Sequence, residues 1–250
     1  MSRESVKKDM IAASEELPEV VGESLEAYKL VKGLPGSKDY PRDEIKEALR
    51  GQQGEIHFSV NTSETPGVPL IDGMENAEVR GSISRKGVEG TVLTGESKMA
   101  LHMDGKGTRV SMTSDDGNVN IHMGNEQSIQ FSGYDDDGNV VSSDGIETTR
   151  KGYRAYSTES YNGDTEHMEV DVRFKRNGGV DVRTTETYEE TFDDGSKSVS
   201  EERVKYRIKP DGRTSVTEKT NSDGIRYTEK EKVTLSPQQM EMFRRAQMNR

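Results

Sequence analysis

The chain has 250 residues, a net charge of −11 and no cysteine, and its mean hydropathy is −0.92. Leu, Ile, Val and Phe together number only 45, a content at which many chains stay disordered. The lack of cysteine excludes disulfides and thiolate metal sites. We therefore expect either a single-layer sheet with solvent on both faces or, the hypothesis we favour, partner subunits that cover what one copy leaves exposed.

Residues 1–50 have the pattern of three short amphipathic helices, the third running from about Pro41 to Arg50 with Gly51 just past its end. We predict a helical docking arm that binds another chain. The alternative is that these helices pack on the sheet of their own chain. The segment is charged throughout, which argues against a signal peptide, and no apolar run approaches the roughly 20 residues of a membrane span. These features favour a virion or the cytoplasm as the location.

From Gly54 onward the apolar period switches to two, and Asp-Gly or Asn-Gly pairs recur at short intervals. These pairs supply the positive φ of tight hairpins, so each indicates a reversal between neighbouring strands. The pattern predicts a mainly β chain folded as an antiparallel meander. The predicted reversals are at residues 85–87, 104–107, 115–117, 135–138, 161–163, 177–179, 193–195, 210–212 and 222–224.

Residues 54–145 form the first predicted β region, a compact one with short strands. Apolar–polar–apolar triplets begin at Leu101, Val110, Ile121 and Ile129. This alternation predicts one apolar face rich in Met and one polar face. Such strands suit a sandwich, a barrel or the stacked rungs of an oligomeric spike.

Residues 152–235 form the second region, in which turns 16 or 17 residues apart leave strands of up to about 13 residues. If Gly178 is left-handed in a three-residue loop, Phe174 faces Val180 and Val172 faces Val182. Similar reasoning pairs Ile208 with Thr214 and Tyr206 with Val216. The apolar stripe fades into Thr and Glu, so we predict long, polar, partly single-layer strands. In their Lys, Glu, Thr and Ser content they resemble the freestanding sheets of spirochaetal outer-surface lipoproteins.

Residues 236–250 predict a C-terminal helix, capped by Ser236 and with Pro237 at its first position. Its end is basic in an otherwise acidic chain. We interpret this helix as a second docking element.

Two sets of residues are candidates for metal binding. His57, His102, His122 and His167 include two histidines in matching triplets, and we expect His102 and His122 to point away from the apolar face, two strands apart. At roughly 10 Å they are too distant to ligate one metal within one subunit. Asp135, Asp137 and Asn139 resemble the start of a Ca²⁺ loop, but Val140 and Ile146 stand where an EF-hand has Gly and Glu. We interpret these residues as surface histidines and an acidic hairpin, and predict no metal or cofactor.

The sequence contains no nucleophile elbow, phosphate loop or HExxH motif, and it has no Trp to wall a cleft. We therefore predict no catalytic residues and a non-enzymatic structural protein, a subunit of a homo- or hetero-oligomer such as a virion, phage tail device or surface fibre. The alternative is a secreted or surface-displayed module that binds a protein or glycan through its sheet face or hairpin tips. A small Ca²⁺-stabilised accessory domain is a third hypothesis. The acidic balance argues against nucleic acid as the main partner.

Overall fold

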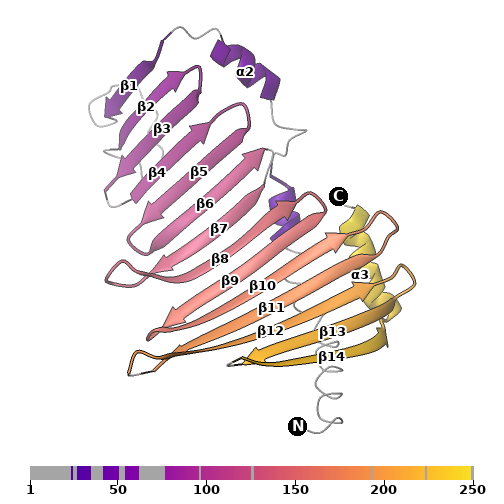
Figure 1. The fold of residues 1–250 in the computed structure, drawn as a ribbon. Coiled ribbons are helices and arrows are strands. Elements are labelled where there is room, and N and C mark those ends of the chain that lie inside the picture. Colours follow the sequence, from indigo (N-terminus) through magenta and orange to yellow (C-terminus); the bar gives the residue numbers. More distant parts are fainter. Residues whose placement is uncertain are drawn as a thin grey trace. The chain divides into compact units, whose positions relative to one another are not determined.

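The computed structural model describes residues 24, 27–34, 42–50, 54–61, 77–95, 97–124, 127–192, 194–222 and 224–248. Fourteen strands follow one another as hydrogen-bonded neighbours in chain order, which confirms the predicted antiparallel meander (Figure 1). The first strands are β1 (Ile56–Asn61), β2 (Glu78–Ser84), β3 (Gly87–Thr94), β4 (Ser97–Met103), β5 (Gly107–Ser114), β6 (Gly117–Gly124) and β7 (Ser128–Tyr134). The later, longer strands are β8 (Val140–Thr149), β9 (Gly152–Tyr161), β10 (Asp164–Phe174), β11 (Val180–Thr191), β12 (Lys197–Ile208), β13 (Arg213–Ser222) and β14 (Ile225–Thr234).

Two compact units share this strand order: Val31–Gly145 is one, and Met1–Leu30 with Ile146–Arg250 is the other. The described helices are short. Residues 27–32 are helical, α2 spans Arg42–Arg50 and α3 spans Pro237–Met248. The predicted helix before Pro18 lies outside the described residues, whereas the predicted helices near 41–50 and after Ser236 are present.

The hairpin turns follow the local sequence closely. Gly178 has φ +83° and closes the predicted three-residue loop, and Asn162 and Gly163, at +53° and +90°, form the turn between β9 and β10. These left-handed positions are the ones that Asn and Gly tolerate. The predicted pairs Phe174–Val180, Val172–Val182, Ile208–Thr214 and Tyr206–Val216 all form. The antiparallel pairs β3–β4, β6–β7 and β8–β9 also form, between strands that the Asp-Gly pattern alone did not separate.

The core of the second unit lies on one face and at one end of the long strands. We call this face of β9–β14 the core face. Its central row runs Tyr153, Val172, Val182, Tyr206 and Val216, all at most 3% exposed. The third row still holds the buried Val170 and Val204, on either side of Thr184. Burial ends at the fourth row, where Glu186 and Glu202 follow on the same face.

Helical segments cover this core. Tyr28 stacks on Tyr153 with ring centroids 4.6 Å apart, and Ser24 Oγ lies 2.9 Å from the Tyr153 hydroxyl. α3 lies by the hairpin ends of the long strands, where Met240 contacts the turn at Gly212 and Phe243 is 2% exposed (Figure 1). Ser236 Oγ accepts a hydrogen bond from Gln239 N and caps α3 as predicted. Ser24 and Tyr28 thus contact β9, and Met240 of α3 contacts the turn at Gly212. That residues 1–50 and α3 also bind another chain stays a prediction.

Candidate binding faces

A cluster of cations lies on the face of the long strands opposite the core face. Arg183, Arg203, Lys205, Arg207, Lys219 and Lys230, together with Thr217, line an open hollow of about 420 Å³, here called the basic hollow. They come from four neighbouring strands, β11 to β14. Successive side chains of a strand point to opposite faces, so this face receives the odd-numbered cations of β11, β12 and β13.

The basic hollow concentrates like charges at a cost in stability. Arg183 lies directly opposite Lys205, and Arg203 directly opposite Lys219. Like charges in such cross-strand pairs destabilise a sheet. Arg203 is bonded to Glu201 at the rim. Among the described residues, no ion pair forms at the other five cations. Asp171 lies opposite Arg183 and Asp181 opposite Arg207, but these acids form their ion pairs with Arg173 and Lys175. The hollow therefore presents an excess of positive charge on a chain whose net charge is negative.

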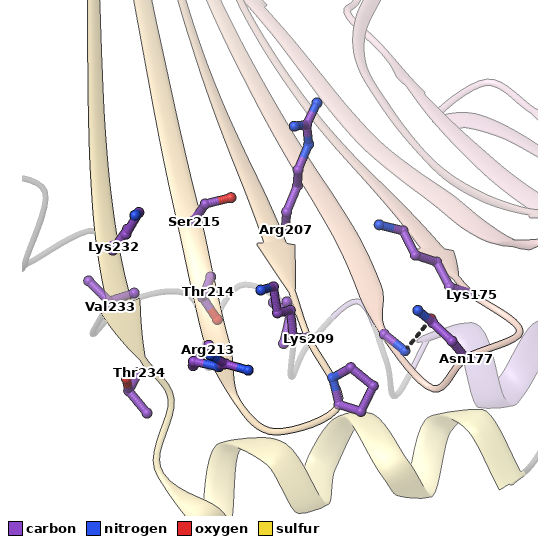
Figure 2. Close-up of a pocket in the computed structure, with 13 residues that line it drawn as sticks. Lys175, Asn177, Arg207, Lys209, Arg213, Thr214, Ser215, Lys232, Val233 and Thr234 are labelled. Carbon is purple, nitrogen blue, oxygen red and sulfur yellow. Dashed lines mark hydrogen bonds between the residues drawn. The ribbon is translucent and has the colours of Figure 1, made fainter.

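A second hollow of about 620 Å³ adjoins it at the hairpin ends. Figure 2 shows Lys232, Ser215 and Arg207 side by side on β14, β13 and β12, as their strand register requires. Lys175 lies nearby, and Asn177 Oδ1 accepts a hydrogen bond of 3.1 Å from Gly179 N, which holds the turn. The basic surface thus extends from the basic hollow to the tips of the hairpins.

The core face carries the opposite charge where its apolar stripe ends. We call Glu186, Glu202, Glu218, Glu229 and Glu231 the acidic patch. Glu186 lies opposite Glu202, and Glu218 opposite Glu229. Burial and the neighbouring carboxylates of Glu218 and Glu186 raise the pKa of Glu202. Strands β11–β14 therefore carry the acidic patch on the core face and the basic hollow on the opposite face.

The first unit presents an apolar face instead. Its side chains come from β1 to β7 in register: Ile56, Phe58, Val79, Ile83, Val88, Val92, Met99, Leu101, Met103, Val110, Met112, Val119, Ile121, Met123, Ile129 and Phe131. This confirms the predicted Met-rich face. Most of these side chains are only half-buried, and Phe131 and Met112 are 51% and 40% exposed. The two, with Val92, Met99 and Val119, line an open hollow of about 530 Å³.

His57, His102 and His122 lie on the polar face of β1–β7, as predicted for His102 and His122, and His167 lies on β10. Arg109 pairs with His102 on one side and His122 on the other, so the two are two strands apart. His102 lies 3.3 Å from a carboxylate oxygen of Glu89 and 3.7 Å from one of Asp104. His57 lies 3.8 Å from Glu55, and His167 Nδ1 lies 2.7 Å from the Thr158 hydroxyl. Each of these three histidines thus has a polar neighbour, and His102 and His122 stay two strands apart.

The Asp135–Asn139 loop is organised by its own hydrogen bonds. Asp135 Oδ1 accepts from the backbone N–H of Asp137 at 3.0 Å and of Asn139 at 2.8 Å. The hydrogen bonds from Asn139 and Asp137 hold the pKa of Asp135 below its usual range. Within the described part of the chain, no group of three His, Asp or Glu side chains is arranged to hold a metal ion.

Comparisons with known proteins add no relative: no family model, curated protein or solved structure matches the chain. No described helix is long and apolar enough to cross a membrane.

Sequence reasoning missed the separation of charge by sign, although the signal is present. Glu229-Lys230-Glu231-Lys232 alternates in sign with the period of a strand, which places acids on one face and bases on the other. The same alternation occurs at Glu202-Arg203 and Glu218-Lys219, and the hairpin register aligns all three segments. Applying the register to the charges as well as to the apolar residues would have revealed both faces.

Proposed function

We propose that the chain is a non-enzymatic structural protein that acts as a subunit of a larger protein assembly. Virions, tail devices and surface fibres are the kinds of assembly that use such long polar meanders, an argument by analogy of fold. The observation that carries the proposal is the half-exposed apolar face of β1–β7.

That face is a contiguous surface rather than a scatter of exposed apolar residues. Every strand from β1 to β7 contributes to it, and directly paired positions such as Met99–Met112 and Val119–Phe131 place apolar groups side by side. Single exposed apolar residues are normal on a soluble protein, whereas a contiguous patch marks an interaction surface. A partner subunit on this face would supply burial that the chain, with 45 Leu, Ile, Val and Phe residues, provides sparingly for itself.

The test replaces two exposed side chains of this face by cations. The double variant Met112→Lys with Phe131→Lys should shift the sedimentation coefficient of the purified protein toward that of a monomer. Thr113→Lys is the matched control, because Thr113 neighbours Met112 on β5 but lies on the polar face. Assembly that is unaffected by the double variant would contradict the proposal that this face carries it.

The second candidate function is a binding module that grips a protein or glycan through its sheet face. The basic hollow favours it, because a local excess of cations on an open sheet is suited to an anionic ligand. A monodisperse monomer at all concentrations would favour this function over the assembly subunit.

A further inference from the structure

The basic hollow and the acidic patch lie on opposite faces of the same four strands. β12 contributes Arg203 and Lys205 to one face and Glu202 to the other, and β14 contributes Lys230 to one and Glu229 and Glu231 to the other. α3 and the described residues near Tyr28 cover core rows at the hairpin end, and the exposed Glu186 and Glu202 lie one row beyond the buried Val204. Glu218, Glu229 and Glu231 share rows with the buried Val204 and Val216 and are half-buried. Each copy therefore carries two surfaces of opposite charge on these strands.

We propose that copies of this chain stack through these surfaces, the basic hollow of one copy facing the acidic patch of a second copy. The inference rests on the proposed function, since it names the partner and one contact of that assembly. Charge complementarity is the argument: six cations line the hollow, and five carboxylates form the patch. Both surfaces are built on β11–β14, so their side chains repeat at the same intervals, about 4.8 Å between strands and about 6.6 Å along them.

Stacking would offset the like-charge repulsion within each face. In a single copy, Arg183–Lys205 and Arg203–Lys219 repel on one face, and Glu186–Glu202 and Glu218–Glu229 repel on the other. When the two faces meet, electrostatic attraction between the copies would offset these repulsions.

The contact has a defined symmetry. Two different surfaces meet, so the second copy still presents its own acidic patch, and a third copy can add to it. Heterologous contacts of this kind generate rings or open filaments rather than closed dimers. The charged groups are largely exposed, so association should weaken as salt rises and the Debye length falls below about 10 Å. The net charge of −11 acts the other way, because screening general repulsion would strengthen association.

A polyanion such as a nucleic acid is the competing occupant of the hollow. It would need only the basic side, whereas stacking needs both. The hollow is lined by cations and Thr217, so it lacks the aromatic side chains on which single-stranded bases stack. The acidic patch on the reverse of the same strands has no role in polyanion binding but supplies the partner surface in stacking.

The experiment is a pair of charge reversals with a rescue. One variant carries Lys205→Glu, Arg207→Glu and Lys219→Glu, and the other carries Glu186→Lys, Glu202→Lys and Glu229→Lys. By sedimentation velocity at low salt, each alone should self-associate at least about tenfold more weakly than the parent. An equimolar mixture should regain association, because the unchanged acidic patch of the first variant can face the unchanged basic hollow of the second. Circular dichroism establishes that each variant folds.

The control variant Lys86→Glu, Lys106→Glu and Lys151→Glu makes the same net charge change at exposed turn positions and should associate nearly as the parent does. The proposal is overturned if the glutamate-reversed variant associates like the parent, or if the mixture shows no rescue. If the hollow-reversed variant alone loses binding to a labelled oligonucleotide while stacking is absent, the hollow binds polyanions instead. Salt-insensitive association that survives both reversals but is lost in Met112→Lys with Phe131→Lys would refute stacking and leave the proposed function standing.

Discussion

The strands β1–β7 and the strands β9–β14 compensate for the shortage of apolar residues in different ways. The first spreads its apolar side chains over a whole face and leaves most of them half-exposed. The second gathers them at one end, where Tyr28, Met240 and Phe243 enclose a small core, and fills the rest with charge. One small enclosed core can therefore anchor long strands whose remaining length presents charged surfaces.

The largest expected difference in stability is between two phenylalanine-to-alanine substitutions, one in β9–β14 and one in β1–β7. Phe174 is 2% exposed and lies beside Tyr28 and Tyr153. Phe174→Ala should therefore lower the free energy of unfolding by about 3–5 kcal/mol. Phe131→Ala, at a side chain 51% exposed, should cost only about 0.5 kcal/mol in dilute solution. Urea denaturation measures both. Equal losses would mean that the face of β2–β7 is enclosed within a single copy.

A smaller effect concerns the helical cover of the second sheet. Ser24→Ala leaves the buried Tyr153 hydroxyl without the hydrogen-bond partner 2.9 Å away, and should cost about 1 kcal/mol. Adding Tyr153→Phe removes both polar groups and should recover part of that loss. Thermal unfolding followed by circular dichroism reports both changes. An unaltered midpoint in Ser24→Ala would indicate that this contact contributes nothing to the core.

Removing a charge from the acidic patch should stabilise the protein, whereas the substitutions above destabilise it. The pKa of Glu202 is raised in the fold, so its ionisation favours unfolding: the penalty is absent below the unfolded pKa of about 4.3 and develops as pH rises through the folded pKa. Glu202→Gln should therefore stabilise the protein at pH 7 by about 0.5 kcal/mol and have no effect in acid.

The neighbouring Glu201 provides the control for that substitution. It lies on the opposite face and forms an ion pair with Arg203, so Glu201→Gln should bring no gain. Unfolding midpoints measured across pH distinguish the two. A gain at Glu202 that persists at low pH would show that charge repulsion is not its cause.

The smallest expected effect is that of metal removal. Because the hydrogen bonds of the loop already occupy the Asp135 carboxylate, excess EDTA should leave the unfolding midpoint unchanged. An ion present at a hundred times its dissociation constant would add about 2.7 kcal/mol. A drop of several degrees with EDTA that Asp137→Ala abolishes would establish a Ca²⁺ site.

Much of the fold follows from local chemistry that the sequence displays. Gly178 and the Asn162-Gly163 pair require left-handed turns, and alternation then places Val172 opposite Val182. The position of Tyr28 on Tyr153 was not predictable, because it depends on contact between segments more than 120 residues apart. The basic hollow required the cross-strand register of four strands together, since no single strand shows the clustering of Arg183 with Lys205 and Lys219.

The mass of the purified chain in solution shows most directly whether copies of this chain assemble. Light scattering over a concentration series, at about 0.05 M and about 0.5 M salt, should give masses above the 27.8 kDa of one chain that rise with concentration and fall with salt. A mass of one chain at every concentration and both salt levels would contradict self-assembly, and would leave the open faces to partners of another kind.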